Sequence, residues 1–66
     1  MTNEVKRVRR ERRLRQQDLA DRAGVSRQTI ISIERGRFRP SVELALKLAR
    51  ELECTVEELF RLEHGA

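Results

Sequence analysis

Residues 16–36 read QQDLADRAGVSRQTIISIERG, and this stretch decides the fold. Apolar residues recur at helical spacing as far as Ala23, and Gly24 then interrupts the pattern. Glycine adopts a positive φ at little cost just past a helix end, and the hydroxyl of Ser26 can accept a backbone N–H bond at the start of a second helix. The stretch therefore predicts two short helices joined by a sharp turn.

The second of these helices carries polar side chains suited to reading bases. Ile30 and Ile33 are three residues apart and point inward, and Val25, just before the cap, can pack on Ile30 as a hydrophobic staple. Arg27 and Gln28 lie in the exposed first turn, where an arginine fork matches two acceptors of guanine and a glutamine amide matches adenine. This arrangement favours double-stranded DNA as the partner. The alternative is an ordinary solvated helix surface.

Taken together, these features resemble the phage-repressor and Cro-like (Xre) helix-turn-helix family. The resemblance lies in an early alanine, the glycine at the turn, two later core isoleucines and a closing Glu-x-Gly, and it continues in RPSVELALKLARELECTVEELF at residues 39–60. It covers about residues 3–62. It implies an all-α, five-helix fold whose third helix lies in the major groove, with dimers on half-sites about 34–36 Å apart.

Position by position, the resemblance also implies roles for individual residues. Arg27, Gln28 and Ser32 match base-reading positions, and Gln16 matches a phosphate contact assisted by the amides at the start of its helix. Arg10, Arg37 and Arg39 match the backbone-clamping regions less specifically. Two of these arginines lie in a loop beside the reading helix, where they are expected to anchor phosphates; the alternative is a merely solvated loop.

Four positions depart from the family pattern. Arg15 stands where Ser or Thr commonly caps the second helix. We therefore expect the cap of that helix to come from backbone geometry or from water, and the start of the helix to fray. Arg13 and Glu53 stand where glycine is common, so we expect left-handed backbone at both. Ile31 is apolar and expected to be exposed, which predicts contact with a thymine methyl. The alternative there is a single exposed apolar residue without a role.

The first helix is expected over residues 3–13, capped by Thr2 or Asn3. Arg9 falls on its apolar face and needs a partner, and Glu34 lies on the inward side of the reading helix. We therefore predict an Arg9–Glu34 ion pair, which the family resemblance also implies. The alternative is that Arg9 reaches solvent and Glu34 is a surface acid.

Two further helices are expected after the loop. Residues 42–52 form a helix with a broad apolar stripe, and Thr55 caps a last helix that ends near Leu62. Phe38 in the loop is either tucked into the core or exposed. Cys54 is expected to pack as a small hydrophobe rather than act as a nucleophile.

Composition limits the chain to one small domain over residues 1–66, with the motif at about 16–35 and a tail at 63–66. Two Phe residues and the absence of Trp and Tyr predict an aliphatic core. One cysteine and one histidine exclude a disulfide and a His/Cys zinc cluster, so no cofactor, metal or small-molecule ligand is expected. No residue set indicates an enzyme, and no apolar run indicates a membrane span or signal peptide. The chain is thus expected to be cytoplasmic.

The net charge of +4 is unevenly distributed. Residues 1–15 carry +5, residues 16–41 carry +2 and residues 42–66 carry −3. Positive potential around the motif suits a polyanion, whereas the acidic end is available for packing or subunit contact.

The sequence therefore predicts a DNA-binding transcriptional regulator that acts as a homodimeric repressor on a palindromic operator. A dimer is expected because a monomer of this size reads too few base pairs to discriminate well. The candidate interface residues are Leu46, Cys54, Val56 and Leu62. Alternatives are an antitoxin or restriction-system controller using the same domain, or a protein-interaction module.

Overall fold

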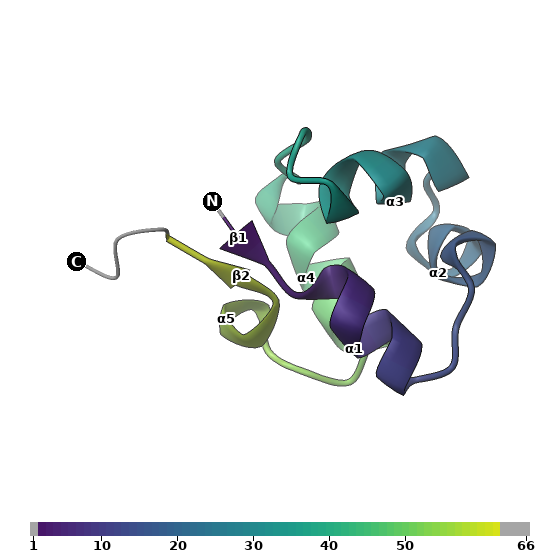
Figure 1. Cartoon of the computed structure of the whole chain (residues 1–66), viewed down its shortest axis with the longest axis horizontal. Coiled ribbons are helices and arrows are strands. Elements are labelled where there is room, and N and C mark those ends of the chain that lie inside the picture. Colours follow the sequence, from purple (N-terminus) through teal and green to yellow (C-terminus); the bar gives the residue numbers. More distant parts are fainter. Residues whose placement is uncertain (1, 63–66) are drawn as a thin grey trace.

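In the computed structural model, which describes residues 2–62, helices account for most of the chain (Figure 1). The helices within these residues are Val5–Glu11 (α1), Gln16–Ala23 (α2), Arg27–Glu34 (α3), Val42–Glu51 (α4) and Val56–Leu59 (α5). Two short strands, Thr2–Asn3 (β1) and Phe60–Arg61 (β2), pair antiparallel. The five-helix, all-α prediction is confirmed, and the strand pair is a small addition to it. No helix among the described residues is long and apolar enough to cross a membrane.

The first helix begins later than the sequence predicts. Thr2 and Asn3 are extended because they pair with Arg61 and Phe60, so α1 starts at Val5. Asn3 nevertheless serves this helix start, since its Oδ1 accepts from the Val5 N–H at 3.2 Å. Its Nδ2 donates to the carbonyl of Ile33 at 2.8 Å, which ties β1 to α3.

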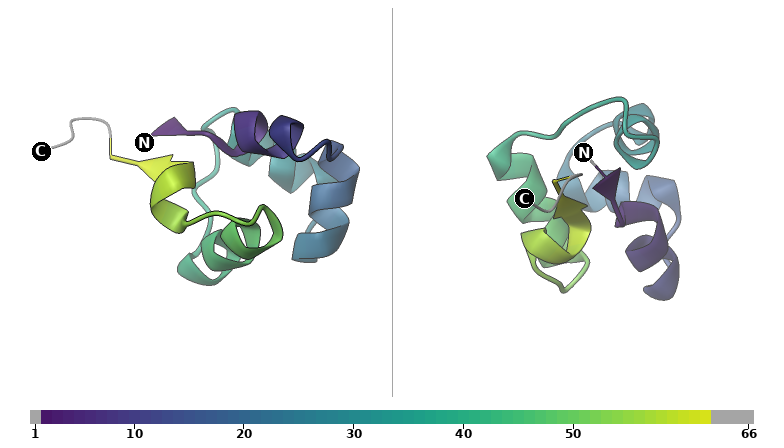
Figure 2. Two further views of the ribbon diagram at one scale, coloured as in Figure 1. Left: turned by 90° about the horizontal axis from the view of Figure 1, so that it is seen from below. Right: turned by 60° about the vertical axis from the view of Figure 1, so that its left-hand side comes forward.

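The last helix ends earlier than predicted for the same reason. α5 stops at Leu59 rather than near Leu62, because Phe60 has extended backbone (φ −128°, ψ 131°) and joins β2. The Glu4 N–H donates to the Leu59 carbonyl at 2.8 Å and continues the pairing of the two chain ends. Both views of Figure 2 show β1 beside β2.

The core is entirely aliphatic, as its composition predicts. α2 packs on α3 and α4, and α4 packs on α5. The clustered buried side chains are Val5, Val8, Leu19, Ala20, Ala23, Ile30, Ile33, Leu48, Ala49, Leu52 and Leu59. Phe38 lies outside this cluster and is 47% exposed. Of its two predicted placements, the exposed one is therefore correct.

The N-cap of α1 is Glu4, which makes no side-chain cap bond, in place of the predicted Thr2 or Asn3. The later helix starts follow the predicted capping pattern with one exception. The hydroxyls of Ser26, Ser41 and Thr55 each accept a backbone N–H three residues later. The exception is α2, which we expected to start without a side-chain cap. The Asp18 carboxylate accepts the Arg15 N–H at 2.8 Å, so the cap comes from within the first turn of the helix. The Arg15 guanidinium also donates to Asp18, and these bonds hold the pKa of that carboxyl below its ordinary value.

The left-handed backbone expected at Arg13 and Glu53 is present, with φ of 59° and 57°. Arg12, beside the first of these, donates from Nε to the Leu52 carbonyl at 2.8 Å and from Nη2 to the Glu53 carbonyl at 3.2 Å. A cation at the end of α4 satisfies carbonyls that have no partner within the helix. Arg12 therefore joins the C-terminal ends of α1 and α4.

The Arg9–Glu34 ion pair links α1 to α3. Arg9 Nε lies 2.7 Å from Glu34 Oε2 and Nη2 lies 3.3 Å from Oε1, with the two side chains 9% and 4% exposed. Arg9 Nη1 donates to the Leu14 carbonyl at 2.8 Å, and Gln16 Nε2 donates to Glu34 Oε1 at 3.2 Å. No buried side-chain polar atom among residues 2–62 lacks a hydrogen-bond partner. The pair is therefore fully hydrogen-bonded and largely shielded from solvent.

Replacing Arg9 should destabilise the domain severely. Arg9→Met leaves Glu34 buried without a counter-charge, which costs about 3–5 kcal/mol of unfolding free energy and approaches the whole stability of a small domain. Urea unfolding followed by circular dichroism measures this loss. Arg7→Met, at an exposed arginine on the same helix, is the matched control and should leave the midpoint nearly unchanged. An Arg9→Met protein as stable as the parent would contradict the prediction.

Candidate nucleic-acid interface

The reading helix α3 presents its N-terminal turn to solvent. Its inner side is held by Ile30 and Ile33, both 0% exposed, while Arg27 and Gln28 are exposed. The Ser26 hydroxyl accepts the Thr29 N–H at 3.1 Å and fixes the start of the helix. The two predicted base-reading side chains therefore project from a rigid, capped helix end.

The other two predicted base-reading residues are less accessible than the sequence suggests. Ser32 and Ile31 are both half-buried. Ile31 lines a hollow between α1, the start of α2 and α3, so part of its side chain packs against the domain rather than standing free. Ile31 was expected to be exposed and is instead half-buried. The accessible part of Ile31 still borders the reading surface.

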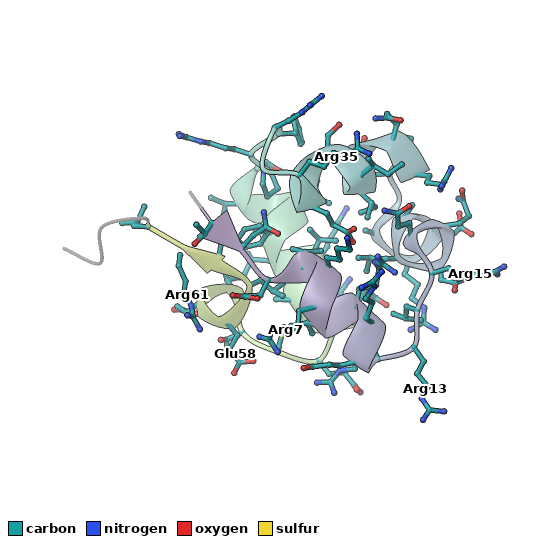
Figure 3. The ribbon with its side chains drawn as sticks, in the orientation of Figure 1. Arg7, Arg13, Arg15, Arg35, Glu58 and Arg61 are labelled. Carbon is teal, nitrogen blue, oxygen red and sulfur yellow. The ribbon has the colours of Figure 1, made fainter. Side chains whose placement is uncertain are left out.

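A basic hollow lies where α1, the α1–α2 turn and the N-terminal ends of α2 and α3 meet. Its lining residues are Lys6, Arg9, Arg10, Arg15, Gln16, Gln17 and Arg27. Figure 3 shows Arg13 and Arg15 pointing away from the ribbon at this turn. Arg7, also on α1, pairs instead with Glu4 and Glu11. The hollow thus gathers positive side chains from α1, the α1–α2 turn and α3 around two helix N-termini, an arrangement suited to phosphate groups.

Lys6 is a functional candidate that sequence reasoning missed. It lines this basic hollow and the neighbouring hollow that holds Ile31. Arg10, which was predicted to contact the DNA backbone, is exposed and lines the same basic hollow. Lys6 lies four residues before Arg10, so the two share a helix face, and that spacing was the available signal.

Gln16 occupies the start of α2, as the phosphate prediction requires. One of its amide hydrogens is used by Glu34 at 3.2 Å. A primary amide has two donors, so a second N–H remains for a ligand. The buried ion pair of Glu34 with Arg9 therefore also orients the Gln16 side chain.

The two loop arginines occupy different places. Arg37 and Arg39 are both exposed after the end of α3. The Arg37 N–H donates to the Ser32 carbonyl at 2.9 Å, which keeps this residue close to the reading helix. Arg39 instead lines an apolar groove between α4 and α5. Sequence reasoning treated the two as equivalent.

The structure brings together only part of the predicted dimer surface. Leu46, 57% exposed, and Val56 line the apolar groove. Cys54 is half-buried against the core, where burial raises the pKa of its thiol, and it does not line the groove. Leu62 is 77% exposed at the end of the described residues, also outside the groove lining.

Comparison with known proteins agrees with this geometry. The sequence profile of a helix-turn-helix family matches residues 5–59. A protein of Methanocaldococcus jannaschii named as an HTH-type transcriptional regulator is 47% identical over 60 residues, or 91% of each chain. One of Bacillus subtilis with the same description is 40% identical over 63 residues, or 96% of each chain.

Solved structures show the same similarity. The restriction-modification controller protein C.AhdI from Aeromonas hydrophila is 34% identical with a TM-score of 0.79, over 85% of each chain. The N-terminal DNA-binding domain of SinR from Bacillus subtilis is 31% identical with a TM-score of 0.78, over 91% of this chain and 88% of that one.

The turn between α2 and α3 should depend on glycine at residue 24. Gly24 has φ of +73°, and a Cβ built there has no atom within 4 Å, so only backbone strain opposes a side chain. Gly24→Ala should lower the unfolding free energy by about 1 kcal/mol while the fold is kept. Thermal unfolding measures this change, with Arg22→Ala on the exposed side of α2 as the control. Equal melting temperatures for Gly24→Ala and the parent would disprove the strain.

Proposed function

Since the chain belongs to the helix-turn-helix family of DNA-binding transcriptional regulators, which are not enzymes, we propose that it is a repressor that binds a palindromic operator as a homodimer. The exposed Arg27–Gln28 turn of α3, directly beside the basic hollow, is the observation that carries this proposal. In this arrangement α3 lies in the major groove and phosphates flank it. Repression requires only that the operator overlap a site that the transcription machinery needs.

The bases are read from the first turns of α3. Arg27 donates its guanidinium fork to guanine, and Gln28 makes a paired contact with adenine. Ser32 lies one turn further along and can bond either kind of base. The accessible part of Ile31 contacts a thymine methyl group from the edge of its hollow.

The phosphates are held on both sides of α3. Gln16, with the amides at the start of α2, takes one phosphate through its free N–H. Lys6 and Arg10 extend this contact along α1, and Arg37 holds the backbone beyond the other end of α3. These contacts set register and salt-dependent affinity without carrying sequence information.

A restriction-system controller is the second candidate function. It is supported by C.AhdI, which is described as a restriction-modification controller protein and matches this chain over 85% of each length. A selected operator found upstream of neighbouring endonuclease and methyltransferase genes would favour this role over a general repressor.

Selection from a random duplex library should test the function directly. We expect a two-fold symmetric consensus with half-sites about 10–10.5 base pairs apart. Arg27→Ala should relax one guanine position in each half-site, with a cost of about 1–3 kcal/mol, and Ile31→Ser should relax a thymine position. Glu43→Ala on α4 is the control and should give the parent consensus. Enrichment of no sequence would refute specific recognition, and an unchanged Arg27→Ala consensus would refute the reading role.

Lys6 should behave as a phosphate contact. Lys6→Ala removes one cation from the basic hollow, so affinity should fall equally for operator and random duplex, and the slope of log K against log salt should become shallower by about 1. Fluorescence anisotropy at several salt concentrations measures this slope. Lys47→Ala, which removes a lysine paired with Glu43 on α4, is the matched control. An unchanged slope for Lys6→Ala would place Lys6 away from the DNA.

A further inference from the structure

We propose that the second copy of the chain docks on the apolar groove between α4 and α5, and that Arg39 of each copy pairs with Glu57 of the partner subunit. This inference rests on the proposed homodimer and assigns its interface. It replaces the phosphate role that the sequence suggests for Arg39.

The groove is an apolar hollow with a volume of about 490 Å³. The residues that line it are Arg39, Pro40, Val42, Ala45, Leu46, Val56, Glu57 and Phe60. Val42 and Leu46 lie one turn apart on α4 and remain 78% and 57% exposed. Single exposed apolar residues are common on protein surfaces, but a continuous apolar groove on so small a domain indicates an interaction site.

The charged residues of the groove indicate what covers it. Arg39 and Glu57 have opposite charges, and neither forms an ion pair with another residue in the described part of the chain. A two-fold axis through the groove brings the Arg39 of one copy to the Glu57 of the other, and the reverse contact follows from symmetry. A second copy thus forms two symmetric ion pairs between Arg39 and Glu57, whereas a purely apolar partner would leave both residues without an ion pair.

The distribution of charge over the chain favours the same face. Residues 42–66, which include α4 and α5, carry a net charge of −3, whereas residues 1–15 carry +5. A dimer formed through the α4–α5 face therefore keeps the strongly basic N-terminal segments of both copies away from the contact. The basic hollow stays free for the phosphates.

The shape of the domain fits the spacing of the half-sites. Figure 1 and the left view of Figure 2 show α5 and β2 at the opposite end of the molecule from α2. A dimer on half-sites one helical turn apart needs each α3 about 17 Å from the two-fold axis. The groove lies at the α5 end, so an axis there separates the two copies of α3 along the length of the domain (Figure 1).

Sedimentation of the full chain over a range of concentrations tests the groove. Leu46→Ser should raise the dimer dissociation constant at least tenfold. Leu62→Ser is the matched control, because Leu62 is more exposed but does not line the groove, and it should sediment as the parent does. Circular dichroism confirms that both variants fold.

Charge reversal tests the pairing. Arg39→Glu and Glu57→Arg should each weaken the dimer about tenfold, because each brings like charges together twice, and the double variant should regain parental affinity. If the double variant does not regain the parental dimer affinity, the Arg39–Glu57 pairing is wrong. Arg39 would then keep the phosphate contact that the sequence predicts for it.

The outcomes separate this inference from the proposed function. If the parent protein dimerises and the Leu46→Ser variant dimerises equally well, the groove is not the dimer interface. The proposal of a dimeric regulator then still stands. A parent protein that is monomeric at high concentration and on its selected operator overturns the dimer itself. In that second case the groove belongs to a different partner.

Discussion

The buried ion pair between Arg9 and Glu34 is the contact on which the rest of the structure depends. It joins α1 to the end of α3, and the carboxylate of Glu34 also accepts a hydrogen bond from Gln16 at the start of α2. Three helices therefore meet at one carboxylate. Such a pair adds little net stability compared with apolar packing, but it penalises any arrangement that separates its members. It thereby sets the position of the reading helix relative to the helix start proposed to bind phosphate.

The domain separates its two proposed interactions by charge and by polarity. Basic side chains of α1 and of the starts of α2 and α3 line one hollow, and apolar side chains of α4 and α5 line another. Arg12 connects these halves through the carbonyls at the end of α4. A short chain can carry both surfaces because the aliphatic core between them requires few residues.

Local features were predictable, and among the long-range contacts the Arg9–Glu34 ion pair was predicted whereas the pairing of β1 with β2 was not. The cap at Ser26 follows from neighbouring residues, and the left-handed Arg13 and Glu53 were expected because the resembling family commonly has glycine at these positions. The helix at the C-terminal end was predicted too long because nothing near Phe60 signals that it pairs with Asn3. The reading turn of the candidate site was recognisable, since glycine, cap and arginine lie together in the sequence.

The sequence by itself determined the two motif helices, their turn and two of the side chains proposed to read bases, Arg27 and Gln28. These depend on hydrogen bonds and packing between residues a few positions apart. Only the tertiary structure decided that Lys6 lines the basic hollow, that Ile31 is half-buried at a second hollow, and that Arg39 lines the apolar groove. Such placements require residues from separate helices to meet, and helical periodicity states which face a residue occupies but not which neighbour covers that face.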